Sequence, residues 1–173
     1  MKTLSTLALL TAAAASQAYT LDVAVGHANS NDFDNASIVG VGIGTQLNND
    51  FHLGFNIASK SLASDLSSPT QFAGVDATVR TATIDLTYEL SSGGIRPFIG
   101  AGVGGVRFSG DSIDTKTAFA TKLFLGISFP ITPNVEFTLT AQNSKFYSVQ
   151  ELAGGPKTNI TSWDGIAGLR FNF

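Results

Sequence analysis

Apolar and polar residues alternate one by one along much of this chain. In YTLDVAVG, residues 19–26, the odd-numbered positions are apolar or aromatic and the even-numbered positions are Thr, Asp, Ala and Gly. Seven further stretches have the same period: residues 37–47, 51–60, 78–90, 95–108, 117–129, 135–145 and 162–173. A two-residue period predicts β-strands with two unlike faces. Eight strands of about ten residues match the length that a tilted strand needs to cross a bilayer.

The links between the predicted strands alternate in length. Residues 48–50, 91–94 and 130–134 are short links rich in Gly, Asn, Ser and Pro, which favour tight turns. Residues 29–36, 61–77, 109–116 and 146–161 form longer, more polar links. This alternation favours an up-and-down barrel over a Greek-key sandwich, with short periplasmic turns on one rim and extracellular loops on the other. Both ends of the barrel chain then lie on the periplasmic rim.

The two faces of the predicted strands differ in chemistry. One face carries aliphatic and aromatic residues without a charge, as at Val39, Val41 and Ile43. The other face carries many glycines, such as Gly40 and Gly42, together with charged residues. The aliphatic face is too extensive for one small soluble core, so lipid is the simpler solvent for it. The sequence therefore predicts an all-β fold, an eight-stranded antiparallel up-and-down transmembrane β-barrel.

Composition and the first residues narrow the picture further. The 173 residues include no Cys, which excludes disulfides and thiolate chemistry. The formal net charge of −3 provides no basic stripe, which argues against nucleic acid as a partner. Residues 1–18 contain an early Lys2, an apolar stretch and Ser16-Gln17-Ala18, the pattern of a secretory signal peptide. We predict a signal peptide at residues 1–18 and a barrel domain at residues 19–173.

The chain ends in LRFNF, which places Leu169, Phe171 and Phe173 on the apolar face of the last predicted strand. This alternating aromatic end resembles the signal by which outer membrane barrels are recognised for assembly. Together with RPFIGAGVGGVRF at 96–108, it makes the chain similar to the small outer membrane barrels related to the outer membrane protein A transmembrane domain and the opacity (porin family) proteins. The resemblance implies an integral outer membrane location, contact with outer membrane lipids and the barrel assembly machinery as a partner. It leaves function open, because the family includes structural barrels and adhesins.

The charged residues of the predicted lumen face form a candidate site. Eight strands enclose a lumen just wide enough for side chains, so a large aqueous channel is disfavoured. A charge inside such a barrel is costly unless it is paired, so we predict an internal ion-pair network. Its members are Asp22, Asp85, Glu89, Arg96, Lys122, Glu136 and Arg170. The network serves either as a structural plug, which we favour, or as the gate of a small pore.

The long links are the candidate recognition surface, because a rigid barrel presents its loops and lets them vary. Leu66, Phe72, Phe146 and Tyr147 are apolar residues in polar surroundings there. They form either an adhesive patch for a host or surface ligand or contacts among the loops. Arg80 and Lys145 have the parity of the lipid face at the outer strand ends, where they could contact lipopolysaccharide phosphates. Solvated rim charge is the alternative for that pair.

Other chemistry finds little support in the sequence. GAGVGG at 100–105 fits a dinucleotide fingerprint, but a strand end follows it where that motif requires a helix. His27 and His52 lack the spacing of a zinc site, and we expect no cofactor or metal. A lipid A hydrolase is a third functional hypothesis, with His27 and Ser30 near Asp32 and Asp34, although the spacing of known deacylases is missing. A changed lipid A profile with Ser30→Ala would support it; otherwise we expect no enzyme.

Overall fold

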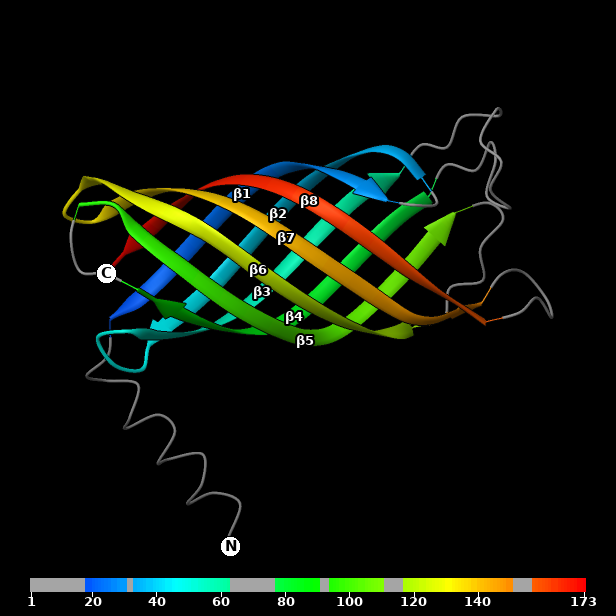
Figure 1. Cartoon of the computed structure of the whole chain (residues 1–173), viewed down its shortest axis with the longest axis horizontal. Helices are drawn as coiled ribbons and strands as arrows, with labels where there is room; N and C mark the ends of the chain where they lie inside the picture. Colours follow the sequence, from blue (N-terminus) through cyan, green and yellow to red (C-terminus); the bar gives the residue numbers. More distant parts are fainter. Residues whose placement is uncertain (1–17, 31–32, 63–76, 91–93, 111–116, 151–156) are drawn as a thin grey trace, which may run out of the picture.

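Eight antiparallel strands close into one barrel in chain order (Figure 1). A computed structural model of the chain describes residues 18–30, 33–62, 77–90, 94–110, 117–150 and 157–173. The strands are β1 (Tyr19–Ser30), β2 (Phe33–Gln46), β3 (Phe51–Leu62), β4 (Ala77–Glu89), β5 (Arg96–Gly110), β6 (Thr117–Thr132), β7 (Val135–Gln150) and β8 (Lys157–Asn172). No helix in this part of the chain is long and apolar enough to cross a membrane.

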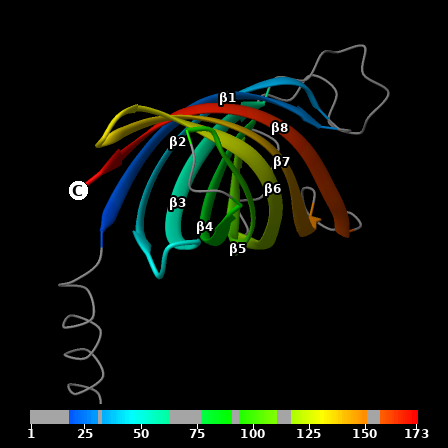
Figure 2. The ribbon, with the colours of Figure 1, turned by 60° about the vertical axis from the view of Figure 1, so that its left-hand side comes forward.

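The barrel closes where β8 pairs with β1. The two strands run antiparallel from Thr20 opposite Asn172 to Ser30 opposite Ser162. At the end of the ladder, the Phe173 backbone N–H donates to the Tyr19 carbonyl at 2.9 Å. Figure 2 shows the strands curving round from β1 to β8 as one continuous wall. Because every strand has two neighbours, the sheet leaves no edge of unpaired backbone groups to face an apolar solvent.

The two rims differ, and we name them for their connections. The turn rim holds the starts of β1 and β3, the ends of β2 and β8, and the turn between β6 and β7 (Figure 1). There Asn48 caps the β2–β3 turn, because its Oδ1 accepts from the Asp50 and Phe51 backbone N–H groups, each at 2.9 Å. The opposite link rim holds the ends of β1, β3, β5 and β7. The predicted fold class and strand order are therefore confirmed.

The predicted strand ends at the link rim are wrong in several places. β1 runs to Ser30 and β2 begins at Phe33, although residues 29–36 were predicted as a loop. Likewise β7 runs to Gln150 and β8 begins at Lys157, within the predicted loop 146–161. The reason is burial: Ala28, Ala36 and Ile160 face inward and pack in one apolar cluster. Most of the predicted signal peptide, residues 1–17, lies outside the described residues.

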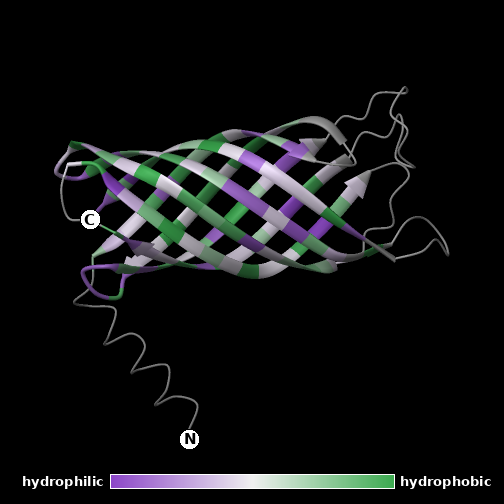
Figure 3. Ribbon diagram, in the orientation of Figure 1, coloured by the Kyte–Doolittle hydropathy of each residue, from purple (hydrophilic) through white to green (hydrophobic). Residues whose placement is uncertain are grey.

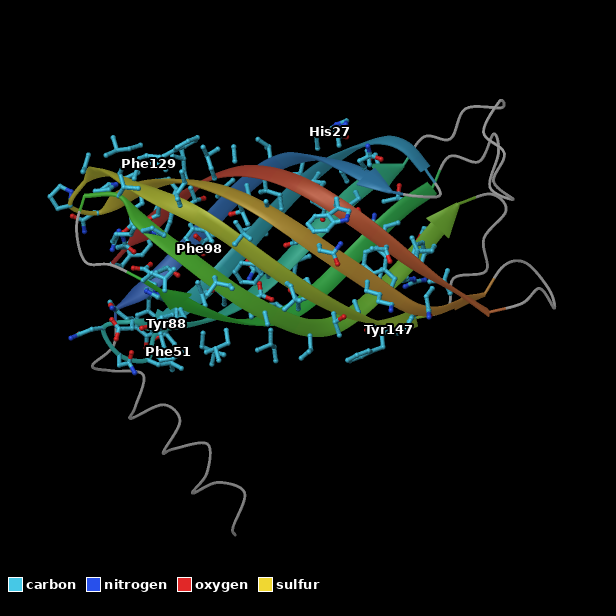
Figure 4. All side chains as sticks on the ribbon, in the orientation of Figure 1. His27, Phe51, Tyr88, Phe98, Phe129 and Tyr147 are labelled. Carbon is cyan, nitrogen blue, oxygen red and sulfur yellow. The ribbon has the colours of Figure 1, made fainter. Side chains whose placement is uncertain are left out.

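The outward face is the apolar one, as the alternation predicted. The ribbon in Figure 3 alternates between hydrophobic and hydrophilic residues along the strands. Val39, Ile43 and Leu123 are each at least 60% exposed, which suits a lipid-facing wall. Aromatic pairs lie on this wall near the turn rim, with ring centroids 4.9 Å apart in Phe51 and Tyr88 (Figure 4). Such an aromatic girdle is typical of a membrane interface.

Two inward phenylalanines fill the space above two glycines on β5 and β6. Phe98 lies opposite Gly126 in the strand register, and Phe124 lies opposite Gly100. A Cβ atom on Gly126 would come within 2.5 Å of the Phe98 ring, and one on Gly100 would collide with the Phe124 ring. The two rings meet edge to face with centroids 6.4 Å apart. Glycine is therefore required here by the ring of the paired residue, which explains part of the PFIGAG sequence.

We predict that Gly126→Leu destabilises the closed barrel, because its side chain would compete with Phe98 and with the Leu139 carbonyl for the same space. Overpacking of this kind costs about 1–3 kcal/mol. The midpoint of the heat-dependent change in gel mobility should fall. Gly165→Ala is the matched control, because a Cβ atom there meets nothing within 4 Å. An unchanged midpoint for Gly126→Leu would contradict the proposed packing.

Candidate functional site

Five charged residues form a network in the lumen near the turn rim. Arg170 Nε donates to Asp22 Oδ1 at 2.8 Å, and Arg170 Nη1 lies 3.4 Å from Glu89 Oε1. Arg96 Nη1 lies 3.5 Å from Glu89 Oε2, and the same guanidinium contacts Glu136. Glu89 thus bridges the two arginines across the lumen. Charge-assisted bonds of this kind satisfy groups that would otherwise be buried without a partner.

Two neutral donors and the His52 ring add to this network. Asn172 Nδ2 donates to Glu136 Oε1 at 2.7 Å, and Ser128 Oγ donates to Glu136 Oε2 at 3.2 Å. His52 Nε2 lies 3.3 Å from Glu89 Oε1. Each glutamate therefore faces at least two polar groups. The network is built from β1, β3, β4, β5, β6, β7 and β8, so it links nearly every strand at this end of the barrel.

A second ion pair lies deeper in the lumen and crosses over β5. Lys122 Nζ lies 2.6 Å from Asp85 Oδ2, which also accepts a hydrogen bond from Asn56 Nδ2 at 2.6 Å. In the strand register Gly102 lies between these partners, opposite Asp85 on one side and Lys122 on the other. A Cβ atom on Gly102 would lie 2.8 Å from Lys122 Cε. The glycine leaves room for the pair to meet.

A third ion pair near the link rim was missed by the sequence analysis. Lys60 Nζ lies 2.5 Å from Asp164 Oδ2, and their side chains are 4% and 0% exposed. Gln142, Ser144 and Ser162 all donate to the Asp164 carboxylate at 2.6–3.3 Å. Lys60 and Asp164 both occupy positions that alternate with the outward residues of their strands. This alternation is the signal that could have placed them in the lumen. Their pairing could not have been foreseen, because β3 and β8 are not neighbours.

An apolar cluster fills the lumen beside this ion pair, and it includes one predicted recognition residue. Phe146 is 4% exposed and lies within β7, not in a loop, so its predicted position is wrong. Its ring packs edge to face on Phe108 with centroids 5.9 Å apart, and Lys60 Nζ lies 5.5 Å from its centroid. The cluster consists of Ala28, Ala36, Ile38, Val79, Val106, Phe108, Ala120, Phe146, Val149 and Ile160. Sequence reasoning failed here because the strand continues past the predicted rim.

A cavity of about 160 Å³ with a mixed polar and apolar lining lies between these layers. Part of its lining is threonine, at Thr20, Thr81, Thr83, Thr87, Thr121, Thr138 and Thr140. It extends from Arg170 to Lys60. Asp85 Oδ1 is buried and accepts no hydrogen bond from the described part of the protein. The cavity is roomy enough to hold several waters, and a water beside the polar part of its lining would satisfy this oxygen.

The predicted rim residues lie on the outward face but not together. Arg80 on β4 and Lys145 on β7 are both exposed and are separated by two strands. Lys145 Nζ lies 5.3 Å from the Tyr147 ring centroid, and that ring faces Phe119 at 5.8 Å. Tyr147 therefore belongs to an aromatic belt on the outside of β6 and β7 (Figure 4). The other two predicted recognition residues, Leu66 and Phe72, lie outside the described residues.

The remaining predicted residues are placed only in part. Leu169 and Phe173 are exposed on the outer face, 39% and 73%, and Phe171 is half-buried. His27 points outward from β1 (Figure 4). Of its suggested hydrolytic partners, Asp32 lies outside the described residues, and Ser30 and Asp34 are described only as parts of β1 and β2. The structure therefore assembles no hydrolytic group from the residues that it describes, and hydrolysis stays a hypothesis.

Comparison with known proteins settles the family. The family described as the outer membrane protein beta-barrel domain matches residues 3–171. This chain belongs to that family of outer membrane β-barrels, which confirms the resemblance that its sequence suggested. None of the curated proteins compared with the chain matches it.

Solved structures give the same fold at low sequence identity. The chain is similar to Neisserial surface protein A, with 18% identity over 91% of this chain and 97% of that chain, and a TM-score of 0.65. OprG from Pseudomonas aeruginosa is 14% identical over 91% and 96% of the two chains, with a TM-score of 0.59. The outer membrane enzyme PagL is 16% identical over 86% and 97%, with a TM-score of 0.53. The same fold thus occurs in a surface protein and in an enzyme, and fold alone does not choose a role for this chain.

We predict that Lys60→Met lowers the free energy of unfolding by about 3–5 kcal/mol, because it leaves the Asp164 carboxylate buried and unpaired. Adding Asp164→Leu should restore most of this stability. Urea titration of the refolded barrel, followed by the fluorescence of Trp163, measures both effects. Lys145→Met on the outer face is the control and should change little. If Lys60→Met were as stable as the unmodified protein, the ion pair would have no structural role.

Proposed function

We propose that this protein is a closed outer membrane barrel with a structural and surface-recognition role, and that recognition takes place at the link rim. The filled lumen is the observation that carries the proposal. Lys60, Asp164 and the apolar cluster occupy one end, while the network around Glu89 occupies the other. A barrel filled in this way has no large channel, so its rims and outer wall are the surfaces left for partners.

We infer that the turn rim faces the periplasm and the link rim faces outward. Outer membrane barrels have short periplasmic turns and longer extracellular loops, and the β2–β3 and β6–β7 connections are short. The signal peptide at residues 1–18 would direct export. The outward Leu169, Phe171 and Phe173 would then be read by the barrel assembly machinery before insertion. Lipopolysaccharide and the other lipids of the membrane are the remaining partners in this proposal.

We predict that recognition depends on the links of the link rim and not on the barrel wall. Residues 63–76 and 151–156 would be replaced by Gly-Ser segments of the same length, and Leu66→Ser with Phe72→Ser would be tested separately. Adherence of expressing bacteria to cultured epithelial cells should fall, while the heat-dependent gel shift of the barrel persists. Phe119→Ser on the outer wall is the control. Unchanged adherence after both replacements would refute a recognition role for these links.

A small gated pore is the second candidate. The cavity of about 160 Å³ supports it, because a chamber with threonines in its lining between two ion-pair layers offers part of a path for water or a small ion. In this alternative the Glu89 bridge to Arg96 and Arg170 acts as the gate. The apolar cluster at the link rim argues against it, because its residues are at most 6% exposed.

We predict that single-channel conductance in planar bilayers stays at its basal level in Glu89→Ala and in Arg96→Ala. Each variant opens the charged layer near the turn rim, but the layer around Lys60 and Phe146 remains in place. Arg80→Ala on the outer wall is the control for general effects of charge removal. A rise in conductance confined to the two lumen variants would favour the gated pore over the closed barrel.

A further inference from the structure

A row of polar side chains lies on the outer face of β3 to β6 near the link rim. In the strand register Ser59 on β3 lies opposite Arg80 on β4, Arg80 opposite Arg107 on β5, and Arg107 opposite Thr117 on β6. Arg80, Arg107 and Thr117 are exposed, and Ser59 is half-exposed. The row thus presents two guanidinium groups between two hydroxyl groups. Arg107 had not been recognised from the sequence as part of a site.

Arg80 and Arg107 are like charges that lie directly opposite each other on neighbouring strands. Directly opposed side chains on antiparallel strands have Cβ atoms roughly 4.5–5.5 Å apart, and like charges at such positions destabilise a sheet. In the described part of the chain no carboxylate forms an ion pair with Arg80 or Arg107, whereas the lumen cations Lys60, Lys122 and Arg170 all have acidic partners. An anion held between the two guanidinium groups would remove the repulsion.

Next to this row, on the side of the turn rim, the outer wall carries small and aliphatic residues. The adjacent row places Ala82 opposite Gly105, and the next places Ile84 opposite Val103. A Cβ atom on Gly105 would touch only Thr117 Cγ2 at 3.6 Å and the Ala118 carbonyl at 3.9 Å, so the surface is open there. The outer wall thus presents two cations, then small residues, then aliphatic residues. This order matches an amphiphile with an anionic head and hydrocarbon chains.

We propose that Arg80 and Arg107 together bind a phosphate group of a phosphorylated glycolipid of the outer leaflet, namely the lipid A part of lipopolysaccharide. The site rests on the orientation proposed above, which puts the link rim in that leaflet. Two planar guanidinium groups can each donate two parallel hydrogen bonds to one phosphate, which lysine cannot do. Ser59 and Thr117 add hydroxyl donors at the flanks, and the lipid chains lie along Ala82 and the aliphatic wall.

The test uses the full barrel refolded in phosphatidylcholine nanodiscs and titrated with diphosphoryl lipid A. Bound lipid is counted by native mass spectrometry, and barrel stability is read from the heat-dependent gel shift. We expect Arg80→Gln with Arg107→Gln to weaken binding at least tenfold, and Arg80→Lys with Arg107→Lys to give an intermediate loss. Ser37→Ala, which removes an exposed hydroxyl group on β2 outside this row, should bind like the unmodified protein.

The stability readout separates a ligand site from a merely structural role. Without lipid A, Arg107→Gln should melt at the same temperature as the unmodified barrel or higher, because the repulsion is gone. With lipid A, the unmodified barrel should melt at the higher temperature. A lower melting temperature for Arg107→Gln in both conditions would overturn the proposal, and so would equal lipid A binding by the double glutamine variant.

The identity of the anion is tested with other probes. Dephosphorylated lipid A should bind at least tenfold more weakly than the diphosphoryl form. Equal binding of dephosphorylated lipid A, phosphatidylglycerol or inorganic phosphate would each overturn the assignment to a glycolipid phosphate. The lipid A binding test does not depend on the proposed closed lumen. A barrel that conducts ions would refute the closed-barrel function, but its binding of lipid A would be unchanged. The nanodisc test also does not depend on which rim faces outward in the cell, because lipid A can reach both faces of a nanodisc.

Discussion

The closure of β8 onto β1 is the constraint on which the rest of this structure depends. In hydrocarbon an unpaired backbone group costs several kcal/mol, so a sheet can exist there only without edges. Closure in turn requires curved, tilted strands that crowd side chains on the inside, and the glycines opposite Phe98 and Phe124 meet that requirement. The outward positions are then free to be uniformly apolar. The two-residue period of the sequence results from this difference between inward and outward positions.

Closure also sets the electrostatic problem inside the barrel. A lumen of eight strands is too narrow to hydrate isolated charges fully, and each lumen cation is accordingly matched with a carboxylate from a strand that lies across the lumen or beside it. The partners of Lys60 and Lys122 come from strands that are not their neighbours, so these contacts brace the cylinder across its interior. The interior therefore stiffens the wall as well as filling it.

The sequence predicts this fold well because period and link length are local properties. Asp22 and Arg170 could be matched from their distances to the chain ends, since their strands pair directly. Contacts across the lumen, such as that of Lys60 with Asp164, depend on the stagger of all the strands between them and could not be derived from alternation. The position of Phe146 was misjudged because polar residues around it suggested a loop, while its parity continued that of β7. The opposition of Arg80 and Arg107 likewise required the exact register of β4 and β5.

The lumen is also divided along its length, with its largest charged network near the turn rim and its apolar cluster near the link rim. With the turn rim facing the periplasm, as proposed above, a barrel inserted from that side would carry its link rim through the hydrocarbon layer, while its turn rim would stay at the side of entry. The half that makes this passage is filled with Ala, Val, Ile and Phe, and its buried Lys60 and Asp164 neutralise each other. In the orientation proposed above, this distribution of polarity would lower the desolvation cost of carrying the link rim across the membrane and would favour insertion in that direction.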